Sequence, residues 1–173
     1  MAAPVKFDKI KLMILDVDGV LTDGGIIINA DGSESKIFSV LDGHGIRMWH
    51  RAGFQSAIIS GRTTEATAHR AKQLEITYVY QQCVEKLPTF EQLLNQTGIK
   101  SNEVAYIGDD IMDIPIIRRV GFGVAVANAV SECKAAAHYV TTNTGGRGAV
   151  RETVEYILKN TGKWDELMKR YLV

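Results

Sequence analysis

The stretch "LDVDGVLTDGG", residues 15–25, decides the fold because it joins an apolar run to a cluster of acids. The preceding run, Leu12-Met13-Ile14-Leu15, is continuously apolar, as expected of a parallel β-strand that is covered on both faces. Asp16, Asp18 and Asp23 then follow within eight positions. Because like charges at the mouth of a buried strand repel one another, the cluster predicts a positive partner at this point.

Strand-like and helix-like segments alternate along the rest of the chain, which predicts an α/β fold with a Rossmann-like, doubly wound parallel sheet. The 173 residues are expected to form a single domain, 1–173, with a small β-hairpin at about 26–40 around the turn Asp31-Gly32. Strands are predicted at 11–15, 26–28, 36–40, 56–59, 78–80, 104–107, 124–127 and 139–141, and helices at 45–52, 63–74, 87–96, 111–119, 130–137, 149–159 and 164–172.

Composition narrows the class of protein. Lysine plus arginine and aspartate plus glutamate number 20 each, which gives no electrostatic reason to expect a nucleic-acid or membrane partner. No apolar run reaches the ~20 residues that cross a bilayer, and the N-terminal segment lacks a separate apolar signal sequence. Cys83 and Cys133 fit no metal or redox spacing. We therefore expect a reduced, cytoplasmic protein.

Polar side chains follow three of the predicted strands. The carboxyl ends of parallel strands share one edge of the sheet, which is where ligands bind in such folds. The residues expected at this edge are Asp16 and Asp18, Ser60 and Arg62, and Asp109 and Asp110.

The converging carboxylates predict a metal ion. Two unit charges 4 Å apart repel by ~4 kcal/mol at an effective dielectric constant of 20, so several together require a cation or altered protonation. An all-oxygen donor set without a histidine or cysteine cluster favours Mg²⁺. The stretch is not an EF-hand loop, because its glycine falls at the fourth position and Ile27 stands where a glutamate is needed.

The remaining polar groups favour phosphoryl transfer. Ser60-Gly61 offers a hydroxyl and open backbone amides at a helix start, and Arg62 can grip an acidic group with two hydrogen bonds. Lys86 is a point charge suited to a phosphoryl oxygen. Each feature also has an ordinary structural explanation: a turn, a helix cap or a solvated surface charge. Their agreement in order and in strand position favours a single site.

Four motifs in this order resemble the haloacid dehalogenase (HAD) superfamily. They are "LDVDGVLT" with Asp16 and Asp18, "IISGR" with Ser60, "VEKLP" with Lys86, and "IGDDIMD" with Asp109 and Asp113. The resemblance implies that Asp16 is the nucleophile that becomes an aspartyl phosphate. It implies that Asp18 protonates the leaving alkoxide and then activates water.

The same resemblance implies the other roles. Ser60 and Lys86 would hold phosphoryl oxygens. Mg²⁺ would be bound by the Asp16 carboxylate, the Asp18 main-chain carbonyl and Asp109. Asp110 and Asp113 would support that end of the metal site without binding the ion.

Within the superfamily, the chain resembles the capless branch, because only the short hairpin separates the first strand from the next helix. "DGHGIR", "SGR", "IGDD" and "TGGRGAVRE" are similar to the phosphatases of 3-deoxy-D-manno-octulosonate 8-phosphate (KDO 8-phosphate). This implies release of KDO and phosphate in lipopolysaccharide biosynthesis. It also implies a homotetramer in which hairpins associate and neighbouring subunits cover a small sugar-acid phosphate.

The substrate contacts are implied by the same resemblance. Related phosphatases of nine-carbon sugar-acid (nonulosonate) 9-phosphates are the alternative, and they tend to carry Glu where this chain has Arg62 and Arg147. Leu41 departs from the common pattern, which often has Arg there. The implied contacts are Asp18, Ser39, Val40, Leu41, Asp42, Gly43, Arg62, Arg70, Lys86 and Arg147.

Two further classes remain open from the residues alone. A phospho-accepting receiver domain also gathers acids, a hydroxyl and a lysine on a parallel sheet, although its acceptor follows a later strand. A noncatalytic lobe of an activating synthetase would share the fold. The four histidines are interpreted as structural or surface residues.

Overall fold

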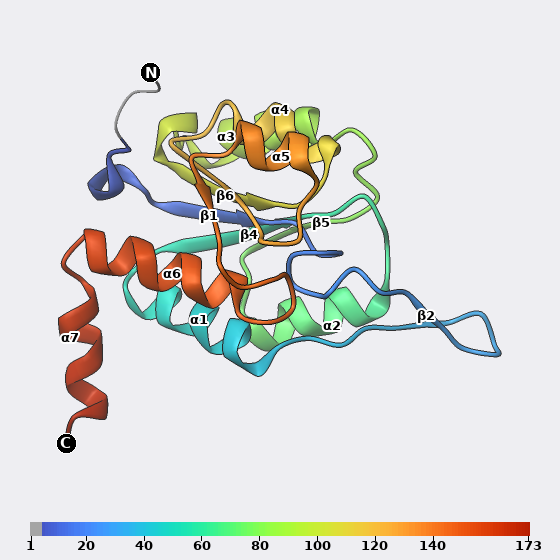
Figure 1. The fold of residues 1–173 in the computed structure, drawn as a ribbon, viewed down its shortest axis with the longest axis horizontal. Coiled ribbons are helices and arrows are strands. Elements are labelled where there is room, and N and C mark those ends of the chain that lie inside the picture. The colour runs from blue at the N-terminus through green and yellow to red at the C-terminus, as the bar shows by residue number, and fades with distance from the viewer. Residues whose placement is uncertain (1–4) are drawn as a thin grey trace.

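A six-stranded parallel sheet forms the centre of the protein in the computed structural model, which describes residues 5–173 (Figure 1). Every neighbouring pair in the order β5-β4-β1-β6-β7-β8 is parallel, which confirms the predicted α/β fold. Residues 1–4 of the predicted domain lie outside the described part. The strands are β1 (Leu12–Leu15), β4 (Gln55–Ile59), β5 (Tyr78–Tyr80), β6 (Val104–Gly108), β7 (Phe122–Ala125) and β8 (Tyr139–Val140).

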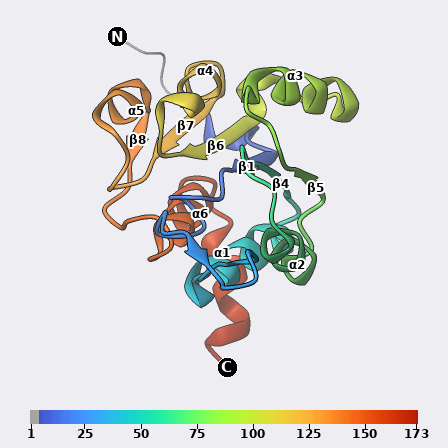
Figure 2. The same cartoon turned by 90° about the vertical axis from the view of Figure 1, so that its right-hand side faces the viewer.

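Helices cover both faces of the sheet, as Figure 2 shows end-on. One face carries α1 (Val40–Arg51), α2 (Glu65–Leu74) and α6 (Ala149–Asn160); the other carries α3 (Lys86–Thr97), α4 (Ile114–Ile117) and α5 (Ser131–Ala136). No helix of the described residues is long and apolar enough to cross a membrane. The remaining short elements are α7 (Trp164–Met168) and the 3-10 turns η1 (Phe7–Lys9), η2 (Ser101–Glu103), η3 (Ile111–Asp113) and η4 (Lys169–Tyr171).

The apolar run of β1 lies at the heart of the core. Its four side chains are fully buried, because helices cover both faces of the sheet and strands pair on both edges. Ile14 lies opposite Ala57 of β4 and Tyr106 of β6. Burying a leucine or isoleucine side chain contributes ~1.5–3 kcal/mol, so this short run is a major source of stability.

The order of the strands makes a crevice beside β1. The chain passes from β1 outward to β4 and β5, then crosses back to β6 and continues to β7 and β8. The connections therefore leave β1 and β6 in opposite directions, and the space between their carboxyl ends stays open. Asp16 follows β1 and Asp109 follows β6, so both residues lie at this switch point.

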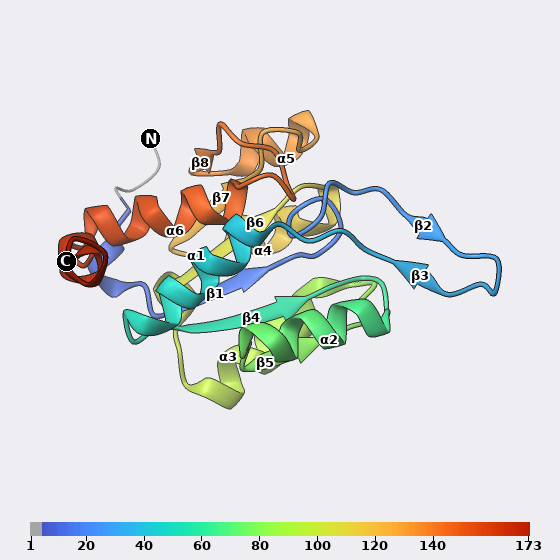
Figure 3. The ribbon, with the colours of Figure 1, turned by 90° about the horizontal axis from the view of Figure 1, so that it is seen from below.

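The predicted hairpin is present, but its second strand is misplaced in the prediction. The hairpin pairs β2 (Ile27–Ile28) with β3 (Glu34–Ser35) and projects beyond the body of the protein (Figure 3). The strand expected at 36–40 is wrong because Ser39 caps a helix: its hydroxyl accepts from the Asp42 N–H at 3.3 Å. Helix α1 consequently begins at Val40, earlier than the predicted start at Gly45.

The helix expected at 111–119 is also shorter than predicted. Asp110 caps the 3-10 turn η3, and Pro115 lies in the first turn of α4, which ends at Ile117. Proline at that place starts a new helix readily but cannot extend an existing one. The polar segment that follows β6 is therefore a turn, which brings its acids back toward the sheet.

Asp42 joins α1 to α6. Its buried carboxylate accepts hydrogen bonds from the backbone N–H groups of Gly148 and Arg151, at 3.1 and 2.9 Å. Burial raises the pKa of Asp42, while these two N–H groups act in the opposite direction. Since the first N–H groups of a helix have no partner within the helix, Asp42 acts as a cap for α6 from another element.

Replacing Asp42 with alanine (Asp42→Ala) is expected to lower the free energy of unfolding by about 2–4 kcal/mol, because buried N–H groups lose their acceptor. Urea unfolding followed by circular dichroism measures the change. The matched control, exposed Asp8→Ala, is expected to change it by less than about 0.5 kcal/mol. Equal stability of the two variants would contradict the capping role.

Candidate active site

The crevice beside β1 holds a cavity of about 290 Å³. It collects side chains from the segments that follow β1, β4, β5 and β6, as expected for the carboxyl ends of a parallel sheet. The predicted site residues that line it are Asp16, Asp18, Ser60, Arg62, Lys86, Asp109 and Asp110.

A buried lysine lies at the base of this cavity. The Lys86 ammonium is 2.9 Å from Asp16 Oδ1 and 2.6 Å from Asp113 Oδ1, and all three side chains are buried. Burial opposes the charge on Lys86, but the two carboxylates outweigh it and raise the lysine pKa above its ordinary value. Lys86 therefore remains a cation in contact with the predicted nucleophile.

Asp113 is fully engaged by four donors. Lys86 and the Tyr106 hydroxyl, at 2.6 Å, donate to Oδ1, while the backbone N–H groups of Asp109 and Asp110 donate to Oδ2 at 2.9 and 3.1 Å. A carboxylate with every lone pair used is a poor further ligand. Asp113 instead holds the backbone of the segment after β6, which fits its predicted supporting role.

Asp16 and Asp109 lie close enough to share a cation. Oxygen atoms of Asp16, Asp109 and Asp113 lie within 4.8 Å of one another. Burial raises the pKa of Asp16 to about 6, against the lowering effect of Lys86. Burial, reinforced by Asp16 and Asp113, raises the pKa of Asp109 to about 8. Without a cation Asp109 retains its proton at neutral pH, while Asp16 does so only below about pH 6, so a metal ion would compete with protons here.

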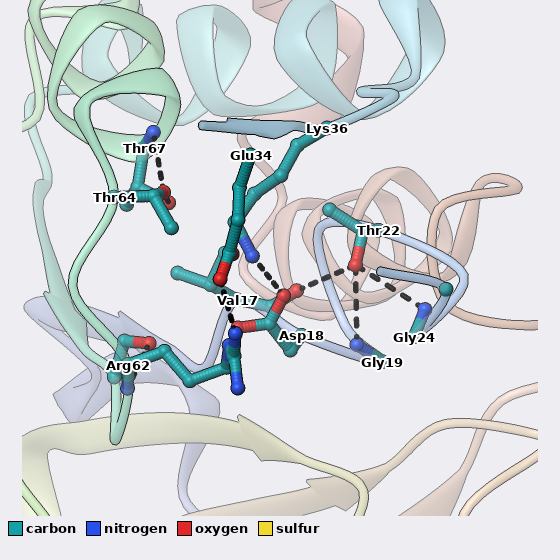
Figure 4. A network of polar contacts seen from close by, with 12 residues as sticks. Val17, Asp18, Gly19, Thr22, Gly24, Glu34, Lys36, Arg62, Thr64 and Thr67 are labelled. Atoms are coloured by element: carbon teal, nitrogen blue, oxygen red, sulfur yellow. Dashed lines mark hydrogen bonds and ion pairs between the residues drawn. The ribbon is translucent and has the colours of Figure 1, made fainter. Parts of the chain in front are cut away.

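Glycine permits this close approach. Gly19 has φ +93°, and a Cβ there would lie 2.1 Å from Asp109 Oδ2. The loop is closed by Thr22, whose hydroxyl accepts from Gly19 and Gly24 and donates to Val17 O (Figure 4). The pattern "DVDGVLT" therefore combines acids with the glycine and threonine that shape their loop.

Ser60 lies at the end of β4, with its side chain buried on the cavity wall. Its hydroxyl accepts from the Arg62 N–H at 3.3 Å. Thr64, not Ser60, caps α2 through the Thr67 N–H. The capping explanation for Ser60 therefore does not apply, and its hydroxyl remains available to a ligand.

Two charged residues from the inner end of the hairpin contact side chains that line this cavity. Lys36 forms an ion pair with Asp18, and Glu34 forms one with Arg62 (Figure 4). Neither residue is among the site residues predicted from the sequence. Glu34 and Lys36 are two positions apart, which places both side chains on one side of an extended strand. This spacing is the sequence signal that could have indicated their shared position.

The other predicted substrate contacts do not lie in this cavity. Ser39, Leu41 and Arg147 line a second cavity of about 310 Å³, and Val40 is exposed. Asp42 and Gly43 are buried against α6 and Arg70, respectively. Arg70 donates to Ser39 O at 3.1 Å. None of these residues lines the cavity that holds Asp16, Asp18 and Asp109 of the same chain. Their role in substrate binding stays a prediction.

Comparison with known proteins identifies the family. The model of the haloacid dehalogenase-like hydrolase family matches residues 75–152. The 3-deoxy-D-manno-octulosonate 8-phosphate phosphatase KdsC of Escherichia coli K12 is 45% identical over 161 residues, which cover 93% of this chain and 86% of that protein.

Solved structures agree with this similarity. The 3-deoxy-D-manno-octulosonate 8-phosphate phosphatase of Moraxella catarrhalis, in complex with magnesium, phosphate and KDO, has a TM-score of 0.93 at 41% identity and 95% coverage of both chains. The cobalt-bound phosphatase of Haemophilus influenzae has a TM-score of 0.87 at 39% identity, covering 91% of this chain and 92% of that one. With these acids at the switch point of this sheet, the chain belongs to the KdsC phosphatase family of haloacid dehalogenase-like hydrolases.

Proposed function

We propose that this protein hydrolyses KDO 8-phosphate to KDO and phosphate through an aspartyl-phosphate intermediate. One observation carries the proposal: the Asp16 carboxylate lies beside the Lys86 ammonium in a cavity that also holds Asp18, Ser60 and Asp109. A carboxylate nucleophile, a cation and a second carboxylate are the groups that phosphoryl transfer to aspartate requires. The 45% identity to a KDO 8-phosphate phosphatase supports the substrate.

In the first step, an Asp16 carboxylate oxygen attacks phosphorus and the bond from phosphorus to the sugar oxygen breaks. The electron pair goes to the sugar oxygen, which takes a proton from Asp18 and leaves as the alcohol. Lys86 and Ser60 hold the phosphoryl oxygens, and Lys86 stabilises the charge that they carry. Lys86 also fixes Asp16, since the two side chains are in contact in the protein without substrate.

In the second step, Asp18 accepts a proton from water while the water oxygen attacks phosphorus. The bond between phosphorus and Asp16 breaks, which returns the carboxylate and releases inorganic phosphate. Asp18 thus ends the cycle with the proton that it gave up in the first step, so the two steps balance.

The residues present fit Mg²⁺. Asp16 is buried and Asp109 half-buried, their carboxylate oxygens lie close together, and the available donors are oxygens. The Asp16 and Asp109 carboxylates, with the main-chain carbonyl of Asp18, would hold the ion. When bound, Mg²⁺ supplies the charge that lets an anionic carboxylate approach an anionic ester.

We propose that the eight-carbon ester is preferred over nine-carbon sugar-acid phosphates. Arg62 lines the cavity of about 290 Å³ beside β1, the catalytic cavity, and Arg147 lines the second cavity, of about 310 Å³. A guanidinium group at either place suits the substrate carboxylate. Arg62 is paired with Glu34 in the free protein, so the substrate carboxylate has to compete with that side chain.

We also propose a homotetramer whose hairpins associate. Three consecutive isoleucines, Ile26, Ile27 and Ile28, are exposed on the projecting hairpin. A second copy would cover this apolar surface. It could also bring a neighbour's segment 39–43 to the catalytic cavity, which would join the two sets of predicted substrate contacts. Packing between subunits would then exclude water in place of a cap domain.

The wider biological assignment is part of the same proposal. The chain 1–173 would act as one catalytic domain, in the cytoplasm, in lipopolysaccharide biosynthesis. The unpaired cysteines, Cys83 and Cys133, are compatible with a reducing compartment.

Phosphate release from KDO 8-phosphate and from a nonulosonate 9-phosphate, measured with Mg²⁺ present, tests the function. We expect kcat/KM to be at least about tenfold higher for the eight-carbon ester. Asp16→Asn is expected to lower kcat by about 10⁴-fold or more, because an amide is a poor nucleophile. Asp165→Asn, on the surface of α7, is the matched control. Preference for the nine-carbon ester would overturn the substrate, and an active Asp16→Asn enzyme would overturn the nucleophile.

The contribution of Asp16 and Asp109 to the stability of the metal-free protein is expected to fall as pH rises from about 4 to about 8. Asp16 and Asp109 bind protons more tightly in the folded protein, with pKa values of about 6 and about 8, than in the unfolded chain, where both are near 3.8. Between these values the folded state holds more protons, so rising pH favours unfolding.

Mg²⁺ should therefore raise the melting temperature more at pH 8 than at pH 5, where it has to displace protons. Calorimetry with and without Mg²⁺ at each pH cancels contributions from groups elsewhere. Asp109→Asn should remove most of the Mg²⁺ effect. An equal Mg²⁺ shift at both pH values would refute this account of the carboxyl pair.

Ile28→Lys is expected to break the tetramer, because it places a charge on the hairpin surface that would be buried between subunits. Ile28 is 71% exposed in the single chain, so the substitution should leave the fold intact. Light scattering after size exclusion measures the mass. Val79→Lys, on the edge strand β5, is the control. A wild-type monomer, or a variant that keeps the mass of four chains, would exclude this interface.

A further inference from the structure

Lys36 holds one oxygen of Asp18. It follows β3 at the inner end of the hairpin, and its ammonium forms an ion pair with Asp18 Oδ1 (Figure 4). The Lys36 side chain is only 2% exposed, against 20% for Asp18. A lysine this deeply buried requires a partner of opposite charge, and Asp18 is the hydrogen-bond and ion-pair partner of its ammonium among the described residues.

The other oxygen of Asp18 lacks a partner. Asp18 Oδ2 is buried and accepts no hydrogen bond from the described residues. Leaving a buried acceptor in this condition is unfavourable, and native proteins rarely do so away from functional sites. Asp18 lines the catalytic cavity, and Oδ2 is its one oxygen without a hydrogen-bond partner among the described residues.

The neighbouring cations are engaged elsewhere. Lys86 is shared by Asp16 and Asp113, and Arg62 is paired with Glu34. Lys36 is thus the cation that holds the Asp18 carboxylate, by its Oδ1 atom. A carboxylate held by a cation at one oxygen presents the other in a defined direction, which an unpaired side chain on a loop does not.

We propose that Lys36 is a positioning residue that holds Asp18 by Oδ1, so that Oδ2 is the oxygen that exchanges the proton with the ester oxygen. The inference rests on the proposed function and deepens it. In the first step, Oδ2 gives its proton to the sugar oxygen as that oxygen takes the electron pair of the breaking bond to phosphorus. Oδ2 then receives a proton from the attacking water. Lys36 touches neither substrate nor phosphorus in either step.

The leaving group provides the test. An alkyl ester needs a proton on its leaving oxygen, whereas p-nitrophenyl phosphate has a leaving group that departs without one. Rapid-quench measurement of the first step, as sugar or nitrophenolate released in a single turnover, isolates this need from the later hydrolysis. Lys36→Met should slow alcohol release from KDO 8-phosphate by about tenfold or more, but nitrophenolate release by less than about threefold.

A double-mutant cycle with Asp18→Asn tests whether Lys36 acts through Asp18. If it does, adding Lys36→Met to Asp18→Asn should change alcohol release by less than about twofold. Lys11→Met, which removes the ion pair of the exposed Lys11 side chain with Glu103, is the matched control and should leave both rates unchanged. Circular dichroism checks folding, and Lys36→Gln replaces the Met variant if the latter does not fold.

The outcomes separate the hypotheses. Equal slowing of both esters, or additive losses in the cycle, would mean that Lys36 only docks the hairpin or stabilises phosphate, and would overturn the proposal. Unchanged alcohol release in Lys36→Met would do the same. Failure of the proposed function gives a different result: wild-type enzyme then releases no alcohol from KDO 8-phosphate. If it hydrolyses another alkyl phosphate, that ester serves in the same comparison.

Discussion

The contact of the buried Lys86 ammonium with Asp16 and Asp113 is the interaction on which the rest of the site depends. Removing the charges of Lys86, Asp16 and Asp113 from water costs free energy, and their contacts with one another offset that cost. The arrangement is asymmetric. Asp113 is saturated by Lys86, Tyr106 and two backbone N–H groups, whereas Lys86 contacts Asp16 through its Oδ1 atom alone. One carboxylate therefore anchors the lysine, and the lysine in turn orients the nucleophile.

Excess negative charge remains after this pairing, and it is the physical reason for the proposed metal ion. Lys86 lowers the pKa of Asp16, yet burial still raises it to about 6, and that of Asp109 to about 8. The backbone enforces the crowding: Gly19 lets Asp109 approach, and a Cβ on Gly145 would lie 1.7 Å from Gly19 O. The fold thus holds acids together at close range, which disfavours their charge until a cation joins them.

The inner end of the hairpin contacts residues of the catalytic cavity, and its projecting part exposes an apolar surface. Glu34 and Lys36 reach Arg62 and Asp18, while the isoleucines of the projecting part are exposed. A short hairpin cannot close over a substrate by itself as a separate domain can. The separation of the 39–43 segment from the acids within one chain is the structural reason to look to a neighbouring subunit for the missing cover.

The sequence by itself determined the parallel sheet, the order of its motifs and the charged and hydroxyl side chains that line the catalytic cavity. Local patterns carry this information, since an apolar run such as Leu12–Leu15 has to be buried and the residues after it have to lie at the sheet edge. Only the tertiary structure decided which charges pair. Lys36 and Asp18 are 18 positions apart, and Asp42 reaches Gly148 across 106. No local pattern encodes those distances, because they follow from how the hairpin folds back and how α6 packs on α1.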